Sequence, residues 1–158
     1  MSDLDDPRCE VLVLGIGNLL WADEGFGVRC VERIAAEWSV PEGVTVMDGG
    51  TQGLYLLPYV QGAQRLIVFD AIDYGLPPGT MKRVEGDEVP RFMGAKKMSL
   101  HQTGFQEVLM LALLTGRYPE QVLLIGCQPE ELEDYGGSLR PVVRRAMDEA
   151  LALGVDTL

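Results

Sequence analysis

The stretch EVLVLGI, Glu10 to Ile16, with GNLLWADEGFGV, residues 17–28, decides the fold of this 158-residue chain. The first part is an almost continuous apolar run that opens into glycine, which predicts a strand buried on both faces at the centre of a sheet. Apolar residues then recur at spacings of three and four, namely Val28, Val31, Ile34 or Ala35, and Trp38. This spacing predicts an amphipathic helix with Asp23 as a candidate N-cap, ending before Pro41.

The alternation of strands and helices continues along the chain. Further strands are expected at Val44–Met47, Arg65–Phe69, Thr80–Glu85 and Gln121–Cys127, and helical segments at Leu54–Val60, Gln102–Leu114 and Leu139–Leu153. The mixed polarity of Thr80–Glu85 favours a sheet edge, Gln102–Leu114 is apolar enough for a buried helix, and Asp87–Met98 is expected to be a loop. The pattern predicts one domain, residues 1–158, with a three-layer α/β/α fold and a twisted, mostly parallel sheet between helices.

Charge and cysteine content narrow the class of protein. The chain has 13 Lys and Arg against 24 Asp and Glu, a net charge of −11, which opposes binding to nucleic acid or anionic lipid. Three cysteines without a CxxC pair, Cys9, Cys30 and Cys127, fit reduced thiols. The acidic start MSDLDDPR does not resemble a secretory signal, and the longest apolar run, Val108–Leu114, is too short to span a bilayer. A cytoplasmic protein that binds neither nucleic acid nor membrane is expected.

Three acidic residues follow the ends of predicted parallel strands. Glu24 follows the first strand, Asp48 ends the second and Asp70 ends the third. Ligands of open α/β sheets bind outside the carboxyl ends of the strands, so these residues should converge at one edge. The single histidine, His101, lies in Ser99-Leu100-His101-Gln102, whose S-x-x-Q form predicts a capping box with the histidine in the first turn of a helix. Two carboxylates and one imidazole would suit nickel or zinc, with positions open for an incoming ligand.

Each candidate residue also has a structural interpretation. Glu24 at a helix start offsets the helix dipole by about 0.3–1 kcal/mol without any further role. Asp48 and Asp70 occupy positions where carboxylates form turns, and His101 suits a hydrogen bond to a loop carbonyl. The edge shared by Glu24, Asp48 and Asp70 is what favours a functional site over separate structural roles.

Other kinds of site have weaker support. The Gly15-Ile16-Gly17 segment begins a dinucleotide-binding fingerprint, but Leu20 stands where GxGxxG requires its third glycine. A nucleotide-binding α/β domain is therefore a minor alternative. No GxSxG motif occurs, and Cys30 and Cys127 lie in apolar segments, so both are expected to be core thiols rather than nucleophiles.

The glycine-rich and acidic motifs match one family of enzymes. They are Gly15-Ile16-Gly17-Asn18 with Asp23-Glu24-Gly25-Phe26-Gly27-Val28, then Asp48-Gly49-Gly50-Thr51, Asp70-Ala71, Pro78-Gly79-Thr80 and Ser99-Leu100-His101-Gln102. In order and spacing, along nearly the whole chain, the sequence resembles the NiFe-hydrogenase maturation endopeptidases. The opening GxGNxLxxDEGxG pattern is the most specific part of this resemblance.

The resemblance implies a cytoplasmic, aspartyl-type endopeptidase that removes a C-terminal extension from the large-subunit precursor of a hydrogenase after nickel insertion. It also implies that Glu24, Asp70 and His101 contact the nickel, which belongs to the precursor. Asp48 is a candidate general base, and nothing in the sequence identifies a covalent nucleophile. The alternative is a non-catalytic nickel-binding maturation chaperone that uses the same three ligands.

Overall fold

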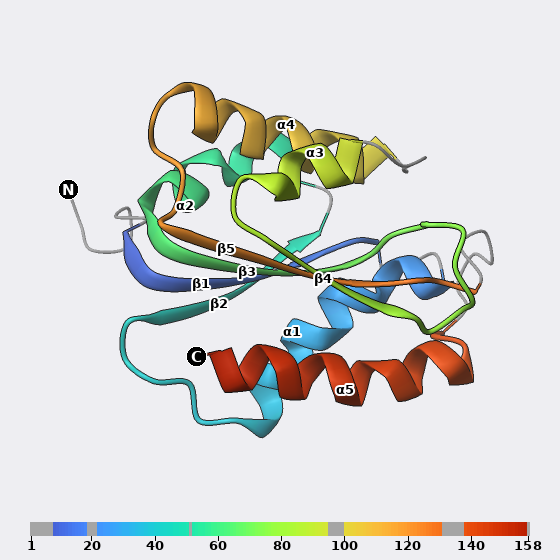
Figure 1. Cartoon of the computed structure of the whole chain (residues 1–158). Helices are drawn as coiled ribbons and strands as arrows, with labels where there is room; N and C mark the ends of the chain where they lie inside the picture. Colours follow the sequence, from blue (N-terminus) through green and yellow to red (C-terminus); the bar gives the residue numbers. More distant parts are fainter. Residues whose placement is uncertain (1–7, 19–21, 51, 95–99, 131–137, 158) are drawn as a thin grey trace.

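A computed structural model describes residues 8–18, 22–50, 52–94, 100–130 and 138–157 of the protein (Figure 1). The described residues form one five-stranded sheet in the order β2-β1-β3-β5-β4. Its strands are β1 (Cys9–Ile16), β2 (Val44–Gly50), β3 (Ala63–Ala71), β4 (Met81–Glu85) and β5 (Gln121–Cys127). All neighbouring strands pair in parallel except β4, which is antiparallel to β5 at the sheet edge.

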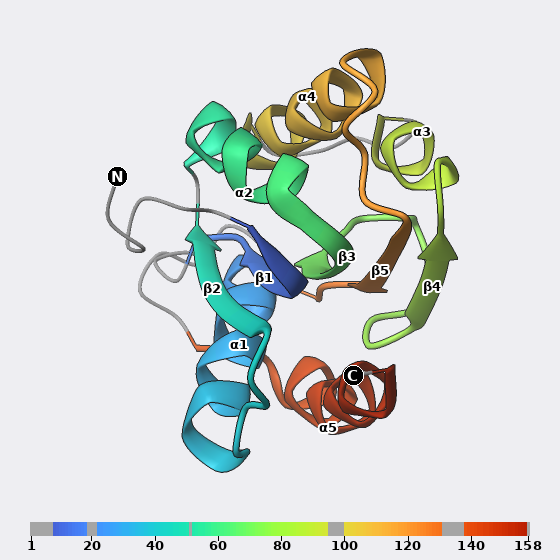
Figure 2. The same cartoon turned by 90° about the vertical axis from the view of Figure 1, so that its left-hand side faces the viewer.

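Helices cover both faces of this sheet (Figures 1 and 2). One face carries α1 (Phe26–Glu37) and α5 (Pro141–Thr157), and the short 3-10 helix η2 (Ala22–Gly25) leads from β1 into α1. The other face carries η3 (Gly53–Leu56), α2 (Leu57–Gly62), α3 (Glu88–Gly94) and α4 (Leu100–Leu114). The predicted three-layer α/β/α fold with a mostly parallel sheet is confirmed. Among the described residues, no helix combines the length and apolarity needed to cross a bilayer.

The sheet separates two hydrophobic cores because successive side chains of a strand point to opposite faces. In β3, Ile67 and Phe69 pack with α1 and α5, whereas Leu66 and Val68 pack beneath α2 and α4. These side chains are at most 2% exposed, which explains why the internal strands read as continuous apolar runs rather than as alternating ones.

The prediction that the first strand is central is wrong. β1 is internal, but β3 occupies the middle of the sheet, with β1 on one side and β5 on the other. β1 and β3 are both buried on both faces, so both appear in the sequence as continuous apolar runs. The apolar pattern therefore cannot tell which of the two lies in the middle, because that depends on where the other strands join the sheet. The Thr80–Glu85 prediction of a polar edge strand is confirmed by β4.

Two predictions on the α4 side of the sheet need correction. The expected loop at Asp87–Met98 contains α3, which Val89 anchors by complete burial, and the Pro90 carbonyl accepts a hydrogen bond from Gln106 Nε2 at 3.2 Å. Residues 95–98 lie outside the described part of the chain. The helix expected to be buried, α4, covers the sheet with one side only, because Met110 and Leu114 are 42% and 78% exposed.

Glycines let α1 lie directly on the strands. A Cβ added to Gly27 would lie 2.8 Å from the Ile16 nitrogen and closer still to the carbonyl oxygens of Ile16 and Phe69. A Cβ at Gly15 would in turn strike the Gly27 carbonyl. The two glycines therefore serve a close helix-to-strand contact, which presses the start of α1 against the carboxyl ends of β1 and β3.

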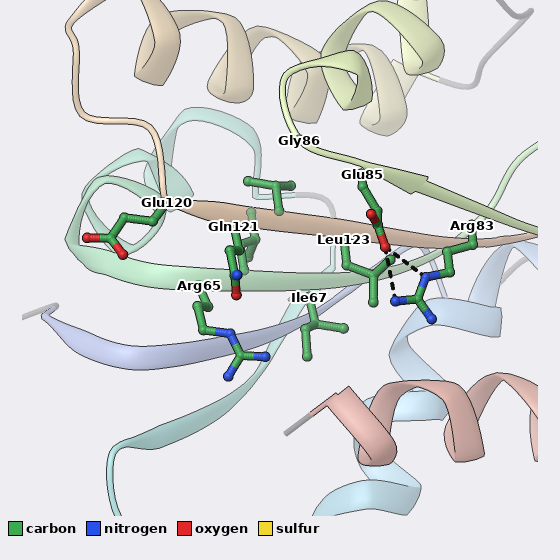
Figure 3. A pocket seen from close by; sticks show the side chains of 10 residues that line it. Arg65, Ile67, Arg83, Glu85, Gly86, Glu120, Gln121 and Leu123 are labelled. Carbon is green, nitrogen blue, oxygen red and sulfur yellow. Dashed lines mark hydrogen bonds and ion pairs between the residues drawn. The ribbon is translucent and has the colours of Figure 1, made fainter.

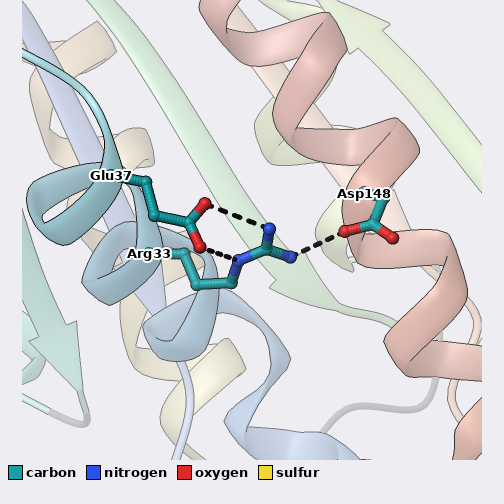
Figure 4. A network of polar contacts seen from close by, with 3 residues as sticks. All are labelled: Arg33, Glu37 and Asp148. Atoms are coloured by element: carbon teal, nitrogen blue, oxygen red, sulfur yellow. Dashed lines mark hydrogen bonds and ion pairs between the residues drawn. The ribbon is translucent and has the colours of Figure 1, made fainter.

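An ion-pair network joins α1 to α5 on the outer surface (Figure 4). The Arg33 guanidinium donates to Glu37 Oε2 at 3.1 Å and to Asp148 Oδ1 at 2.7 Å. Such partly exposed pairs contribute about 0.2–1 kcal/mol each, so the network orients the two helices more than it stabilises them.

Candidate active site

The elements that carry the predicted site residues meet at the carboxyl edge of the parallel strands. At the start of α4, a Cβ added to Gly104 would touch Gly53 Cα at 3.7 Å, and Gly53 follows the carboxyl end of β2. Beyond the end of α4, Thr115 accepts a hydrogen bond from Gln61 Nε2 at 3.1 Å, beside the start of β3. The start of α4 therefore lies at the same edge as η2 and the end of β3, on the right of Figure 1.

Asp70 is the penultimate residue of β3 and is completely buried. It is in phase with Leu66 and Val68, so it points toward the face that α4 covers. Across the sheet it pairs with Gly126 of β5. Its position beneath the helix that carries His101 agrees with the expected convergence of these two elements.

A tyrosine lies beside this carboxylate. A Cβ added to Gly126 would lie 2.6 Å from the Tyr74 hydroxyl oxygen, so the glycine leaves room for the phenol. Burial, and then the negative charge of Asp70, raise the pKa of Tyr74, so the phenol stays protonated near the carboxylate. Sequence reasoning missed Tyr74, because nothing in the chain links an isolated tyrosine to a glycine 52 residues later.

Asp48 is placed differently from Asp70. It lies near the end of β2, is exposed, and pairs with Gly15 of the neighbouring strand β1. Val44 and Val46, which are in phase with it, pack against the core on the α1 side. The two aspartates therefore leave the sheet on opposite faces and can share a ligand only beyond the ends of the strands.

The two remaining predicted ligands are placed by their backbones. Glu24 lies in η2, between the end of β1 and the start of α1, and His101 is the second residue of α4. The predicted first-turn position of His101 is thus confirmed. The side chains of Glu24 and His101, and the Ser99 of the predicted capping box, lie outside the described part of the structure.

Asp23 has a different role from the predicted one. Gly25, which has no side chain, occupies the N-cap position of α1, so no side-chain hydrogen bond caps the helix at this residue. The Asp23 carboxylate is completely buried, and its Oδ2 and Oδ1 accept hydrogen bonds from the backbone nitrogens of Glu130 at 2.8 Å and Arg140 at 2.7 Å. The N-cap prediction is therefore wrong, because distant backbone donors replace the local ones.

Gln128 organises the loop that follows β3. It is 5% exposed, and its Oε1 accepts hydrogen bonds from the backbone nitrogens of Tyr74 at 2.7 Å and Leu76 at 3.2 Å. Its Nε2 donates to Asp73 Oδ1 at 3.0 Å. A buried side-chain amide whose oxygen and nitrogen both form hydrogen bonds fixes a loop well, and here it fixes the turn that carries Tyr74 back over β5.

The buried cysteines are poor nucleophiles. Burial, then the negative charges of Asp23 and Glu149, raise the pKa of Cys127 to about 12. Burial, then Cys127, raise the pKa of Cys30 well above its ordinary value. Because the thiolate is the reactive form, both residues are inert thiols, as the sequence predicted.

A surface hollow of about 380 Å³ lies away from this edge (Figure 3). It is lined by residues at the starts of β3 and β5, among them Arg65 and Gln121, and by an ion pair between Arg83 and Glu85 at 3.0 Å. Arg65 and Gln121 lie at the amino ends of the parallel strands, and Arg83 and Glu85 lie beside them on the antiparallel strand β4, so the hollow is not part of the candidate site.

The fold and the acidic residues at one edge of the sheet define the class of protein. It is a three-layer α/β/α domain with its candidate site at the carboxyl ends of parallel strands. A family model described as hydrogenase maturation protease matches residues 28–157. The hydrogenase expression/formation protein HoxM of Cupriavidus necator is 65% identical over 148 residues, which cover 94% of this chain and 73% of that protein. The chain belongs to the hydrogenase maturation protease family and is a peptide hydrolase.

A sequence match and a solved structure from Escherichia coli agree with this assignment. The hydrogenase 2 maturation protease is 40% identical over 142 residues, which cover 89% of this chain and 85% of that protein. The solved structure of the hydrogenase maturating endopeptidase HybD matches with a TM-score of 0.88 at 38% identity, covering 94% of this chain and 91% of that chain. The likeness therefore extends over nearly the whole sheet and its helices.

Proposed function

We propose that the protein removes a C-terminal extension from the large-subunit precursor of a NiFe hydrogenase, in the cytoplasm, after nickel has been inserted. The observation that carries this proposal is the match to hydrogenase maturation proteases over nearly the whole chain. The free thiols of Cys9, Cys30 and Cys127 support a reducing compartment.

Glu24, Asp70 and His101 are proposed to recognise the nickel of the precursor. Support comes from the backbone positions of η2, β3 and α4, which bring these residues to one edge of the sheet. Two carboxylates and an imidazole form a mixed donor set that binds a divalent transition metal and leaves coordination positions for the precursor's own ligands. Docking the nickel on the protease would hold the scissile peptide in place, an effect that can supply several kcal/mol of barrier lowering.

Water is the proposed nucleophile, and Asp48 the proposed general base. The buried thiols of Cys30 and Cys127 stay protonated at neutral pH, so neither favours a covalent mechanism. The Asp48 carboxylate is exposed at the end of β2, where a peptide laid across the strand ends can approach it. Asp48 lies two strands away from Asp70, with β1 between β2 and β3, and we propose that the scissile peptide lies across this separation, between the base and the metal.

The test compares purified nickel-loaded and nickel-free precursor, each incubated with the protein while mass spectrometry follows the C-terminus. Cleavage of the loaded form alone is expected. The variants Glu24→Gln, Asp70→Asn and His101→Gln should each lose this cleavage, whereas Glu32→Gln, a change at an exposed glutamate of α1, should retain it. Equal cleavage of both precursor forms would contradict nickel recognition. Tight binding of free nickel without any change in precursor mass would favour the chaperone alternative.

A further inference from the structure

The Asp23 carboxylate ties together two connections that are far apart in the sequence. It lies in η2, in the connection from β1 to α1, and accepts hydrogen bonds from the amides of Glu130 and Arg140. These residues lie 107 and 117 positions further along the chain, on the two flanks of the connection from β5 to α5. The three residues are called the Asp23 clamp below.

The clamp requires a carboxylate. Each of its two oxygens accepts one backbone N–H, and the side chain is completely buried, so water cannot replace either bond. Arg140 also directly precedes α5, and its carbonyl accepts hydrogen bonds from the nitrogens of Val143 and Arg144 in the first turn of that helix. The negative charge of Asp23 thus lies at the N-terminus of α5, where the helix dipole favours an anion.

The backbone next to the clamp is strained. Ala22, directly before Asp23, has a φ of +40° and is completely buried. A residue with a Cβ rarely adopts this conformation, and it persists only where the surrounding structure imposes it. The hydrogen bonds of Asp23 and the close packing of Gly27 on the strands both hold the chain that follows Ala22 in place.

We propose that Asp23 is a positioning residue for the cleavage reaction. By fixing η2 against both flanks of the β5–α5 connection, it holds the backbone of Glu24 at the carboxyl edge, toward Asp70 and the start of α4. This inference rests on the proposed function, because it assumes that Glu24 contacts the nickel of the precursor. A catalytic geometry tolerates little displacement, and an error of about 1 Å can lower a rate about 100-fold.

The test uses the Asp23→Asn variant in the full chain. The Asn oxygen can accept one of the two bonds, but its NH₂ group must face the other N–H, so one side of the clamp opens. We expect faster amide hydrogen exchange at Glu130 or Arg140, and a loss of at least tenfold in kcat for nickel-loaded precursor with a smaller change in KM. The cleavage rates are measured at a temperature at which circular dichroism shows the variant to be folded.

Two further variants separate positioning from loss of stability. Val60→Ala removes buried volume from α2, near the amino edge of the sheet, and should lower the Tm while kcat stays within twofold of the wild-type value. Asp23→Ser, which also loses one of the two bonds, replaces Asp23→Asn should that protein not fold. A kcat within twofold of wild type in a folded Asp23 variant would overturn the proposal.

The outcome also separates this inference from the proposed function. Wild-type protein that leaves every precursor form uncut would contradict the proposed function, while hydrogen exchange at Glu130 and Arg140 would still test the clamp. Unchanged exchange at both amides in Asp23→Asn would overturn the clamp even where the wild-type protein cleaves normally.

Discussion

The close contact between α1 and the sheet predicts a large effect of Gly27→Ala. The new Cβ would lie 2.8 Å from the Ile16 nitrogen, and closer to two carbonyl oxygens, of which one belongs to Phe69 in the central strand. These are backbone atoms of two internal strands, so the helix must move instead. Overpacking of this kind costs about 1–3 kcal/mol, and the rigid neighbours place Gly27 at the upper end of that range.

Helix propensity offsets part of this cost. Replacing glycine by alanine within a helix stabilises it by about 0.8–1 kcal/mol, so the net loss should be about 2 kcal/mol. For a chain of this size, that loss lowers the Tm by about 4–8 °C. Gly104→Ala is the matched control, because among the described residues the new Cβ in α4 would meet Gly53 Cα alone, at an ordinary distance of 3.7 Å. This control should raise the Tm by about 2–4 °C.

Denaturant titration and calorimetry of both variants measure these changes. A Gly27→Ala protein as stable as wild type, or a Gly104→Ala protein as destabilised as Gly27→Ala, would refute the packing argument. The presence of glycine at positions 15 and 27 would then need another explanation, such as a bound ligand. A shift in Tm on adding a dinucleotide would point to the nucleotide alternative.

Four more predictions concern the site, the thiols and the surface. Asp48→Asn should lower kcat for precursor cleavage by about 100- to 10,000-fold, the usual contribution of a general base. The same variant should keep its Tm within about 2 °C of the wild-type value, because the residue is exposed. An unchanged kcat would contradict the role of Asp48 as general base. The Cys127 thiol has its ordinary pKa of 9.0 in the unfolded chain and a pKa of about 12 in the folded protein. Between these two pH values unfolding releases a proton, so the free energy of unfolding should fall as the pH rises from about 9 to 12. The fall should reach up to about 1.4 kcal/mol per pH unit. Cys127→Ala should flatten this dependence in urea titrations, and a slope as steep as wild type would contradict the assignment. Alkylation followed by mass spectrometry should label Cys30 only after unfolding; rapid labelling of the native protein would contradict its burial. Arg33→Ala should cost about 1 kcal/mol or less in the same titrations, since its ion pairs are partly exposed, and a loss above about 2 kcal/mol would contradict that estimate.

Much of the fold could be predicted from local patterns. The apolar runs at Glu10–Ile16, Arg65–Phe69 and Gln121–Cys127 all lie within observed strands, because a strand buried on both faces has almost no tolerance for polar residues. The polar edge strand was recognisable for the opposite reason. Strand order was not, since the position of β3 between β1 and β5 depends on contacts between segments that share no local pattern.

Features of the site that depend on distant partners were beyond the sequence. Asp23 before a helix has the local signature of an N-cap, and its true donors lie more than 100 residues away. Tyr74 gains its place near Asp70 only because Gly126 leaves space on a neighbouring strand. The segments of Glu24, Asp48 and Asp70 could be predicted to converge, because the carboxyl ends of parallel strands share one edge in any open α/β sheet.

The most direct measurement is a crystal structure of the protein with Ni²⁺ added, located by anomalous diffraction at the nickel absorption edge. We expect one nickel ion at the carboxyl edge, bound by a carboxylate oxygen of Glu24, a carboxylate oxygen of Asp70 and a ring nitrogen of His101, at about 2.0–2.2 Å. An imidazole more than about 10 Å from both carboxyl groups, far beyond those bond lengths, or a nickel ion bound elsewhere, would contradict the account.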